Sequence, residues 1–125
     1  MHAAMFRTLQ ECMAELTGIE PRHDFRGNDT QVRIYQITPV ESYVEINYSP
    51  ETEFTRIYAA MPRSSAIVLN SRADDTTIFC RQSSHNSPDH VIVSYLLLEQ
   101  VPASQGRDIL TQLLRVAYPD ALMHT

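Results

Sequence analysis

The chain has 125 residues, of which 43% are hydrophobic and 20% charged, and this composition is typical of one globular domain rather than a disordered or fibrous chain. Fifteen acidic residues outnumber ten basic ones, so the formal net charge is -5, and nucleic acid is a poor partner because its binding depends on neutralising phosphates. All ten basic residues are arginine, which excludes Schiff-base and lysine general-base chemistry.

The first predicted element is an amphipathic helix over residues 4–17. Its apolar side chains recur at helical spacing, and Gly18 supplies a C-terminal cap. Phe6 lies at the edge of this stripe and widens it, so the helix offers more apolar surface than one core face needs. The stripe consists of Met5, Leu9, Cys12, Met13 and Leu16.

Three strands of an antiparallel meander are predicted next, because the apolar period changes from 3.6 to 2 and polar turns separate the runs. In the first strand, Val32 and Ile34 share one face, and Tyr35 and Ile37 share the other. We expect helices to cover the first pair and leave the second at the surface. The three strands span residues 31–38, 43–48 and 54–61.

The remaining elements are one ambiguous segment, two strands and a helix. Residues 66–70 form an apolar run that fits a buried strand and a short helix equally well. The second of the two strands is apolar on both faces from Tyr95 to Leu98, so we expect a helix on one side and a helix or a second subunit on the other. The two strands span residues 76–82 and 90–99, and the helix spans 103–117, followed by a loosely held tail at 120–125.

Helices at both ends of a run of strands indicate an α+β fold, here a single domain over residues 1–125. We expect a twisted antiparallel sheet of about five strands flanked by the N- and C-terminal helices. The N-terminus has no apolar stretch of signal-peptide length, and the longest apolar run is far shorter than a membrane span, so we expect a cytosolic protein.

No motif in the chain predicts catalysis, a cofactor or a metal. Cys12 and Cys80 are interpreted as buried thiols, since neither lies in a metal-binding or redox pattern. His85, Asp89 and His90 have a metal-like composition, but their polar loop provides no common face for ligands. The adjacent acids at 74–75 are interpreted as turn formers. We therefore expect a binding protein rather than an enzyme.

The order of elements resembles that of the class I chaperones of bacterial type III secretion, the Tir-chaperone-like family. The resemblance covers nearly the whole chain: residues 6–19, residues 68–70 before a strand, and residues 96–99 leading into 109–117. Residues 62–70 are the segment available for the family's middle helix, which generally belongs to its dimer interface. The resemblance implies a bacterial cytoplasmic homodimer that binds an effector protein's N-terminal segment and keeps it extended for export, without nucleotide.

Two sets of residues are predicted to serve this function. Surplus apolar groups on the first helix and the meander are predicted to bind the partner; the doubly apolar strand and the middle segment are predicted to form the dimer interface. The partner-binding set is Phe6, Leu9, Met13, Tyr35, Ile37 and Tyr43, and the dimer set is Val68, Leu69, Tyr95 and Leu97. Two other classes remain open: a dimeric scaffold of roadblock or profilin-like layout, and a small immunity or inhibitor protein.

Overall fold

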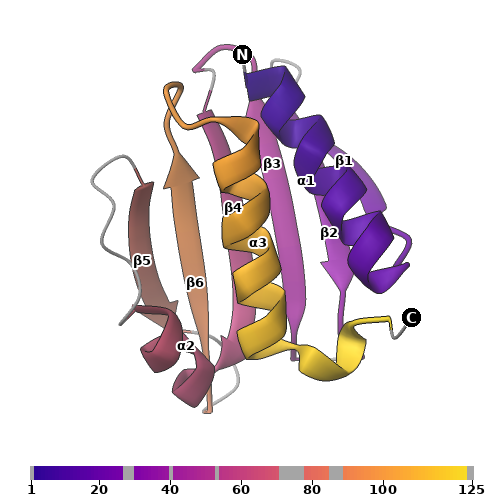
Figure 1. The fold of residues 1–125 in the computed structure, drawn as a ribbon, viewed down its shortest axis with the longest axis vertical. Helices are drawn as coiled ribbons and strands as arrows, with labels where there is room; N and C mark the ends of the chain where they lie inside the picture. The colour runs from indigo at the N-terminus through magenta and orange to yellow at the C-terminus, as the bar shows by residue number, and fades with distance from the viewer. Residues whose placement is uncertain are drawn as a thin grey trace.

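The computed structural model describes residues 2–26, 30–39, 41–52, 54–70, 78–84 and 89–123 (Figure 1). The helices are α1 (His2–Thr17), α2 (Arg63–Asn70) and α3 (Ala103–Ala117), followed by the short 3-10 helix η1 (Pro119–Ala121). The strands are β1 (Arg22–Arg26), β2 (Thr30–Gln36), β3 (Tyr43–Ser49), β4 (Phe54–Pro62), β5 (Ile78–Ser84) and β6 (His90–Leu97). The turns predicted at 27–29 and 74–75 lie outside the described residues.

The six strands form one sheet in the order β1-β2-β3-β4-β6-β5, and all five neighbouring pairs are antiparallel. The predicted α+β class with an antiparallel sheet is therefore confirmed, and six strands replace the expected five. The added strand is β1, which pairs residue by residue with β2 from Arg22 opposite Ile34 to Arg26 opposite Thr30. Its sequence is mostly charged, which is typical of an edge strand protected against unwanted pairing.

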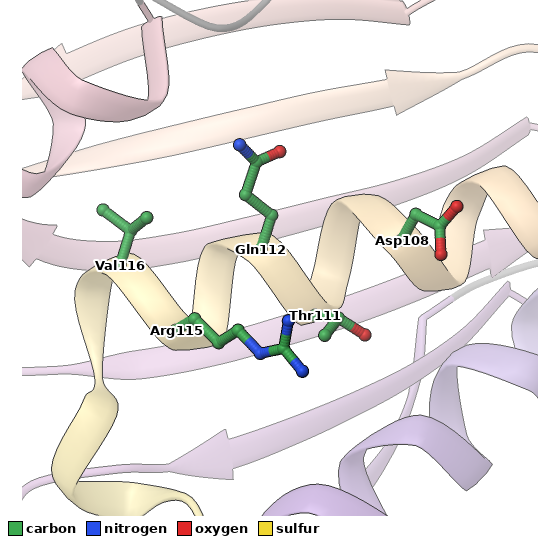
Figure 2. A pocket seen from close by; sticks show the side chains of 5 residues that line it. All are labelled: Asp108, Thr111, Gln112, Arg115 and Val116. Atoms are coloured by element: carbon green, nitrogen blue, oxygen red, sulfur yellow. The ribbon is translucent and has the colours of Figure 1, made fainter.

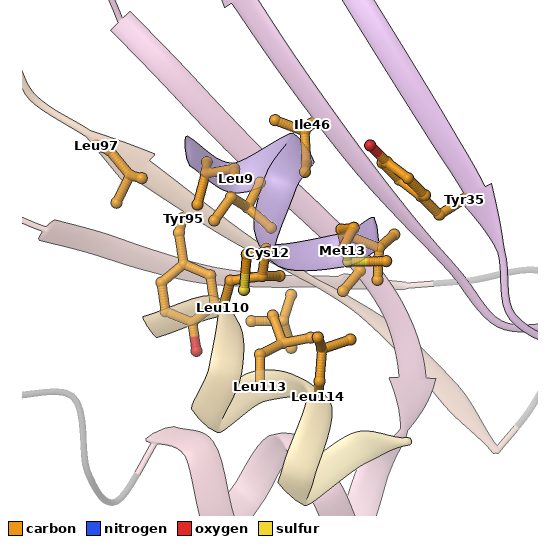
Figure 3. Packing of buried hydrophobic residues seen from close by; sticks show 14 of the residues in the cluster. Leu9, Cys12, Met13, Tyr35, Ile46, Tyr95, Leu97, Leu110, Leu113 and Leu114 are labelled. Atoms are coloured by element: carbon orange, nitrogen blue, oxygen red, sulfur yellow. The ribbon is translucent and has the colours of Figure 1, made fainter. Parts of the chain in front are cut away.

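The helices pack on one face of the sheet, with α3 between α1 and α2 (Figure 1). Along β6 every second side chain is buried, from Val91 to Leu97, which is the period expected when one face meets a core. In the core, Leu9, Cys12 and Met13 of α1 lie near Leu110 and Leu113 of α3 (Figure 3). Side chains from β2, β3, β4 and β6 complete the same cluster.

Helices α1 and α3 approach each other closely at Gly106. A Cβ at this position would overlap the Met5 sulfur and lie 2.8 Å from the Met5 methyl carbon. Arg107 of α3 also donates from Nη2 to Oε2 of Glu15, near the C-terminal end of α1, over 2.6 Å. The absence of a side chain on Gly106 thus allows two helices to share one layer over the sheet.

The segment after α3 returns to the end of α1. Gly18 has a φ of 66°, the left-handed conformation that ends a helix most easily with glycine. The Met123 N–H donates to the Leu16 carbonyl over 2.8 Å, so an orphan carbonyl at the end of α1 is satisfied. The tail predicted to be loose is therefore held in place as far as Met123.

Residues 63–70 form the helix α2, which settles the strand-or-helix alternative left open by the sequence. Pro62 ends β4, and Ala66 and Leu69 turn inward, three residues apart on one side of the helix. Within the described part of the chain, no helix has the length and apolar character needed to cross a membrane.

Candidate protein-binding surfaces

Most of the residues predicted to bind a partner lie in the core instead. Phe6, Leu9 and Met13 of α1 are buried, as is Tyr35 of β2. Figure 3 shows Leu9, Met13 and Tyr35 pointing into the space between α1 and the sheet. The prediction that these four side chains form an accessible surface is wrong.

The wide apolar stripe of α1 is needed because this helix has two neighbours, the sheet below and α3 beside it. Phe6, at the edge of the stripe, is covered as well. The Phe6 ring centroid lies 6.0 Å from the Tyr48 ring centroid. The guanidinium carbon of Arg33 lies 5.5 Å from the Phe6 ring centroid. Among the described side chains of α1, no large hydrophobic one is exposed to a partner.

The two faces of β2 are reversed relative to the prediction. Tyr35 is paired with Val44, whose side chain faces the helices, so Tyr35 is in the core, and burial raises its pKa to about 12. Ile34, predicted to face the helices, lies on the other side of the sheet opposite Glu45. Ile37, just after β2, is partly buried against the core, whereas Tyr43 is half-buried on the side away from the helices.

The predicted dimer set also divides between core and surface. Leu69, Tyr95 and Leu97 are buried within the monomer, so they cannot meet a second copy in this conformation, and their assignment to an interface is wrong. Val68 is 39% exposed, and the neighbouring Ile67, which was not predicted, is 62% exposed. These two adjacent side chains form the exposed apolar pair of α2.

The sheet surface that no described helix covers is called the open face here. Its side chains alternate with the buried ones along each strand, and they mix apolar and polar groups. Val32 and Ala60 belong to it and are fully buried, although neither joins the main core cluster. On β2, β3, β4 and β6 its apolar members include Val32, Ile34, Tyr43, Tyr58, Ala60, Ile92 and Leu96, and its polar members include Gln36, Glu45, Asn47, Arg56 and Ser94.

The polar groups of the open face are concentrated on β3 and β4. Asn47 donates to Glu45 Oε2 over 3.1 Å, and Arg56 Nη1 lies 3.4 Å from the Tyr58 hydroxyl. Glu45 stands directly opposite Tyr58 in the strand register. On β3 and β4 the open face thus carries the Glu45 carboxylate and the Arg56 guanidinium beside the apolar groups of the neighbouring strands β2 and β6.

A groove of about 350 Å³ opens at the end of the sheet where α3 stops. One wall is the connection between β2 and β3, and the other is the end of α3 with η1. Tyr118 fixes the second wall, because its buried hydroxyl donates to the Ala60 carbonyl and lies 3.3 Å from the Tyr43 carbonyl. Burial raises the pKa of Tyr118, so this hydroxyl stays protonated as a donor.

A second hollow, of about 310 Å³, lies on the outer side of α3. Figure 2 shows Gln112 and Val116 on one side of the helix and Thr111 and Arg115 on the side nearer α1. Its described lining residues all belong to this one helix, so it is a space between neighbouring side chains on the helix surface. It brings no nucleophile and base together.

The thiol and histidine groups singled out in the sequence lie partly outside the described residues. Cys12 is buried, and its thiol lies 3.6 Å from the Thr111 hydroxyl; burial raises the pKa of this thiol, which disfavours a reactive thiolate. The side chain of Cys80 and the whole of His85 lie outside what the structure describes. Among the described residues, no three His, Cys, Asp or Glu side chains converge on a common point.

No protein-family model, curated protein or solved structure matches this chain. Its function must therefore be inferred from its own surfaces. Three of these remain as candidates: the open face, the exposed apolar pair of α2, and the groove at the end of α3. Only Tyr43 and Val68 of the ten predicted site residues have exposed or half-exposed side chains on the first two surfaces.

Proposed function

We propose that this chain is a non-catalytic binding protein that forms a homodimer and holds an extended segment of another protein. In the setting that the resemblance implies, the segment belongs to an effector kept unfolded in the bacterial cytoplasm before type III secretion. The observation that carries the proposal is the open face, because the described helices all lie on one side of the six-stranded sheet and the other side carries half-buried apolar groups.

The arrangement of elements supports the same function. A first helix, a meander, a short middle helix, two strands and a last helix follow one another, with β1 as one strand more than the three on which the resemblance was drawn. The middle segment is helical, as in the secretion chaperones, and it carries the exposed apolar pair at the position where those proteins generally dimerise.

An extended segment suits this surface for a physical reason. A strand added at a sheet edge gains main-chain hydrogen bonds, and its alternate side chains fall on one face of the enlarged sheet. The sheet has two such edges, β1 and β5. Side chains of a segment that runs from an edge over the open face would contact apolar members such as Ile34 near β1 or Leu96 near β5.

We expect Ile67→Asp to convert a dimer into a monomer. Ile67 is 62% exposed in the isolated chain, so a carboxylate there is tolerated in the monomer, but at an apolar dimer contact it would be buried without a partner. Sedimentation equilibrium measures the change: the unsubstituted protein should have a mass near twice 14.3 kDa, and the variant a mass near 14.3 kDa.

The matched control is Met123→Asp, because Met123 is 52% exposed and lies at the end of α1 rather than on α2. It should leave the dimer intact. A monomeric unsubstituted protein at micromolar concentration, or a dimer that survives Ile67→Asp, would contradict dimerisation through α2.

A further inference from the structure

The groove at the end of α3 combines an apolar floor with negative charge. Ile37, Pro62 and Ala117 supply apolar lining, while Glu41 and Asp120 stand in opposite walls. Asp120 is exposed and Glu41 is 52% exposed; Glu41 Oε2 lies 3.7 Å from Nε2 of His90, which also lines the groove. The described lining residues include no arginine, and the chain has no lysine.

The end of α3 adds to this negative potential. Helix α3 stops at Ala117, and the last carbonyls of a helix carry the negative end of its dipole. The Tyr118 and Pro119 carbonyls in this wall already accept hydrogen bonds from Ala121 and Leu122, so the formal charge of the wall comes from the Asp120 carboxylate. Two carboxylates beside an apolar floor favour a cation with a hydrocarbon stem.

We propose that this groove binds a basic side chain, arginine or lysine, of the partner's extended segment. The methylenes would cover the apolar floor, and the charged end would lie between Glu41 and Asp120. The inference rests on the proposed function, because it takes the partner to be a protein segment. It adds a chemical requirement: the segment has a basic residue outside the part that meets the open face.

The test uses short capped peptides, Ala-Arg-Ala and Ala-Lys-Ala, with Ala-Gln-Ala as the neutral comparison, added to the full-length protein at neutral pH and low ionic strength. Backbone amide chemical shifts report binding at Ser42, Ala117 and Ala121, which all line the groove. The basic peptides should bind there about fivefold more tightly than the glutamine peptide, the difference expected for ion pairs with partly exposed carboxylates.

Glu41→Gln combined with Asp120→Asn should remove this preference. The control Asp108→Asn, whose carboxylate lies on the outer side of α3 in the other hollow, should keep it. Equal shifts with the glutamine peptide, or a preference that survives the double substitution, would overturn the inference. Binding of these peptides requires neither a dimer nor the open face, so their failure would not contradict the proposed function. Conversely, loss of segment binding at the open face would not contradict binding of a basic side chain in the groove.

Discussion

Leu97→Asp is expected to unfold the protein, whereas the same change at Leu96 is expected to leave it folded. The two residues are adjacent in β6, but Leu97 is fully buried under the helices and Leu96 lies half-exposed on the open face. Replacing Leu97 with aspartate removes the favourable burial of the leucine side chain. It also buries a carboxylate without a charged partner. Such changes cost about 4 kcal/mol or more, a large part of the roughly 5–15 kcal/mol that stabilises a domain.

Urea unfolding followed by circular dichroism measures both variants. Leu96→Asp should shift the free energy of unfolding by about 1 kcal/mol or less, the range of changes at partly exposed sites. If the two variants lost similar stability, both faces of β6 would be covered. That result would remove the open face from this account.

Gly106→Leu should destabilise the protein by about 3 kcal/mol, at the upper end of the cost of overpacking a core. The new side chain needs the space that Met5 occupies, and Met5 is fully buried between α1 and α3. Thermal unfolding with calorimetric detection measures the loss. Gly106→Ala should cost less, because its single methyl gains helix propensity while displacing only the flexible end of Met5.

The double variant Gly106→Leu with Met5→Ala separates crowding from other effects. Shortening Met5 empties the space that the leucine needs, so the pair should be more stable than the sum of the two single losses by about 1 kcal/mol or more. Additive losses would mean that the two positions do not compete for space. The close approach of α1 and α3 at Gly106 would then be incorrect.

The order of the elements could be predicted from the sequence because apolar periodicity depends on each element alone. The helix over 4–17, the meander and the last helix all have one clear period. Strand β1 was missed because its residues Arg22–Arg26 have almost no apolar alternation, as edge strands often do. The turn signal in the sequence at 27–29 could have indicated β1. A turn that begins one strand of a hairpin also ends the strand before it.

The surfaces could not be predicted, because periodicity separates the two faces of an element without telling which face is covered. Tyr35 and Ile34 lie on opposite faces of β2, and each face carries an apolar group, so only tertiary packing assigns Tyr35 to the core. Phe6 was assigned to a partner because the stripe of α1 was compared with one neighbour, whereas this helix packs against two. The sequence only weakly indicates that Ile67 is exposed. If residues 63–70 form a helix, Ile67 points either inward with Ala66 and Leu69 or outward, and the sequence alone does not decide between them.

The central claim is that the open face binds an extended segment, and selection from a display library of random strand-length peptides tests it most directly. Enriched peptides are measured against the unsubstituted protein, against Tyr58→Arg on the open face, and against Gln112→Arg on the outer side of α3. Tyr58 is partly exposed and lies opposite Glu45, so an arginine introduced there faces a carboxylate and the sheet should keep its fold. We predict enriched peptides whose affinity falls by about an order of magnitude for Tyr58→Arg, as at an interface anchor, and stays unchanged for Gln112→Arg. No enrichment, or binding that Tyr58→Arg leaves intact and Gln112→Arg removes, would contradict it.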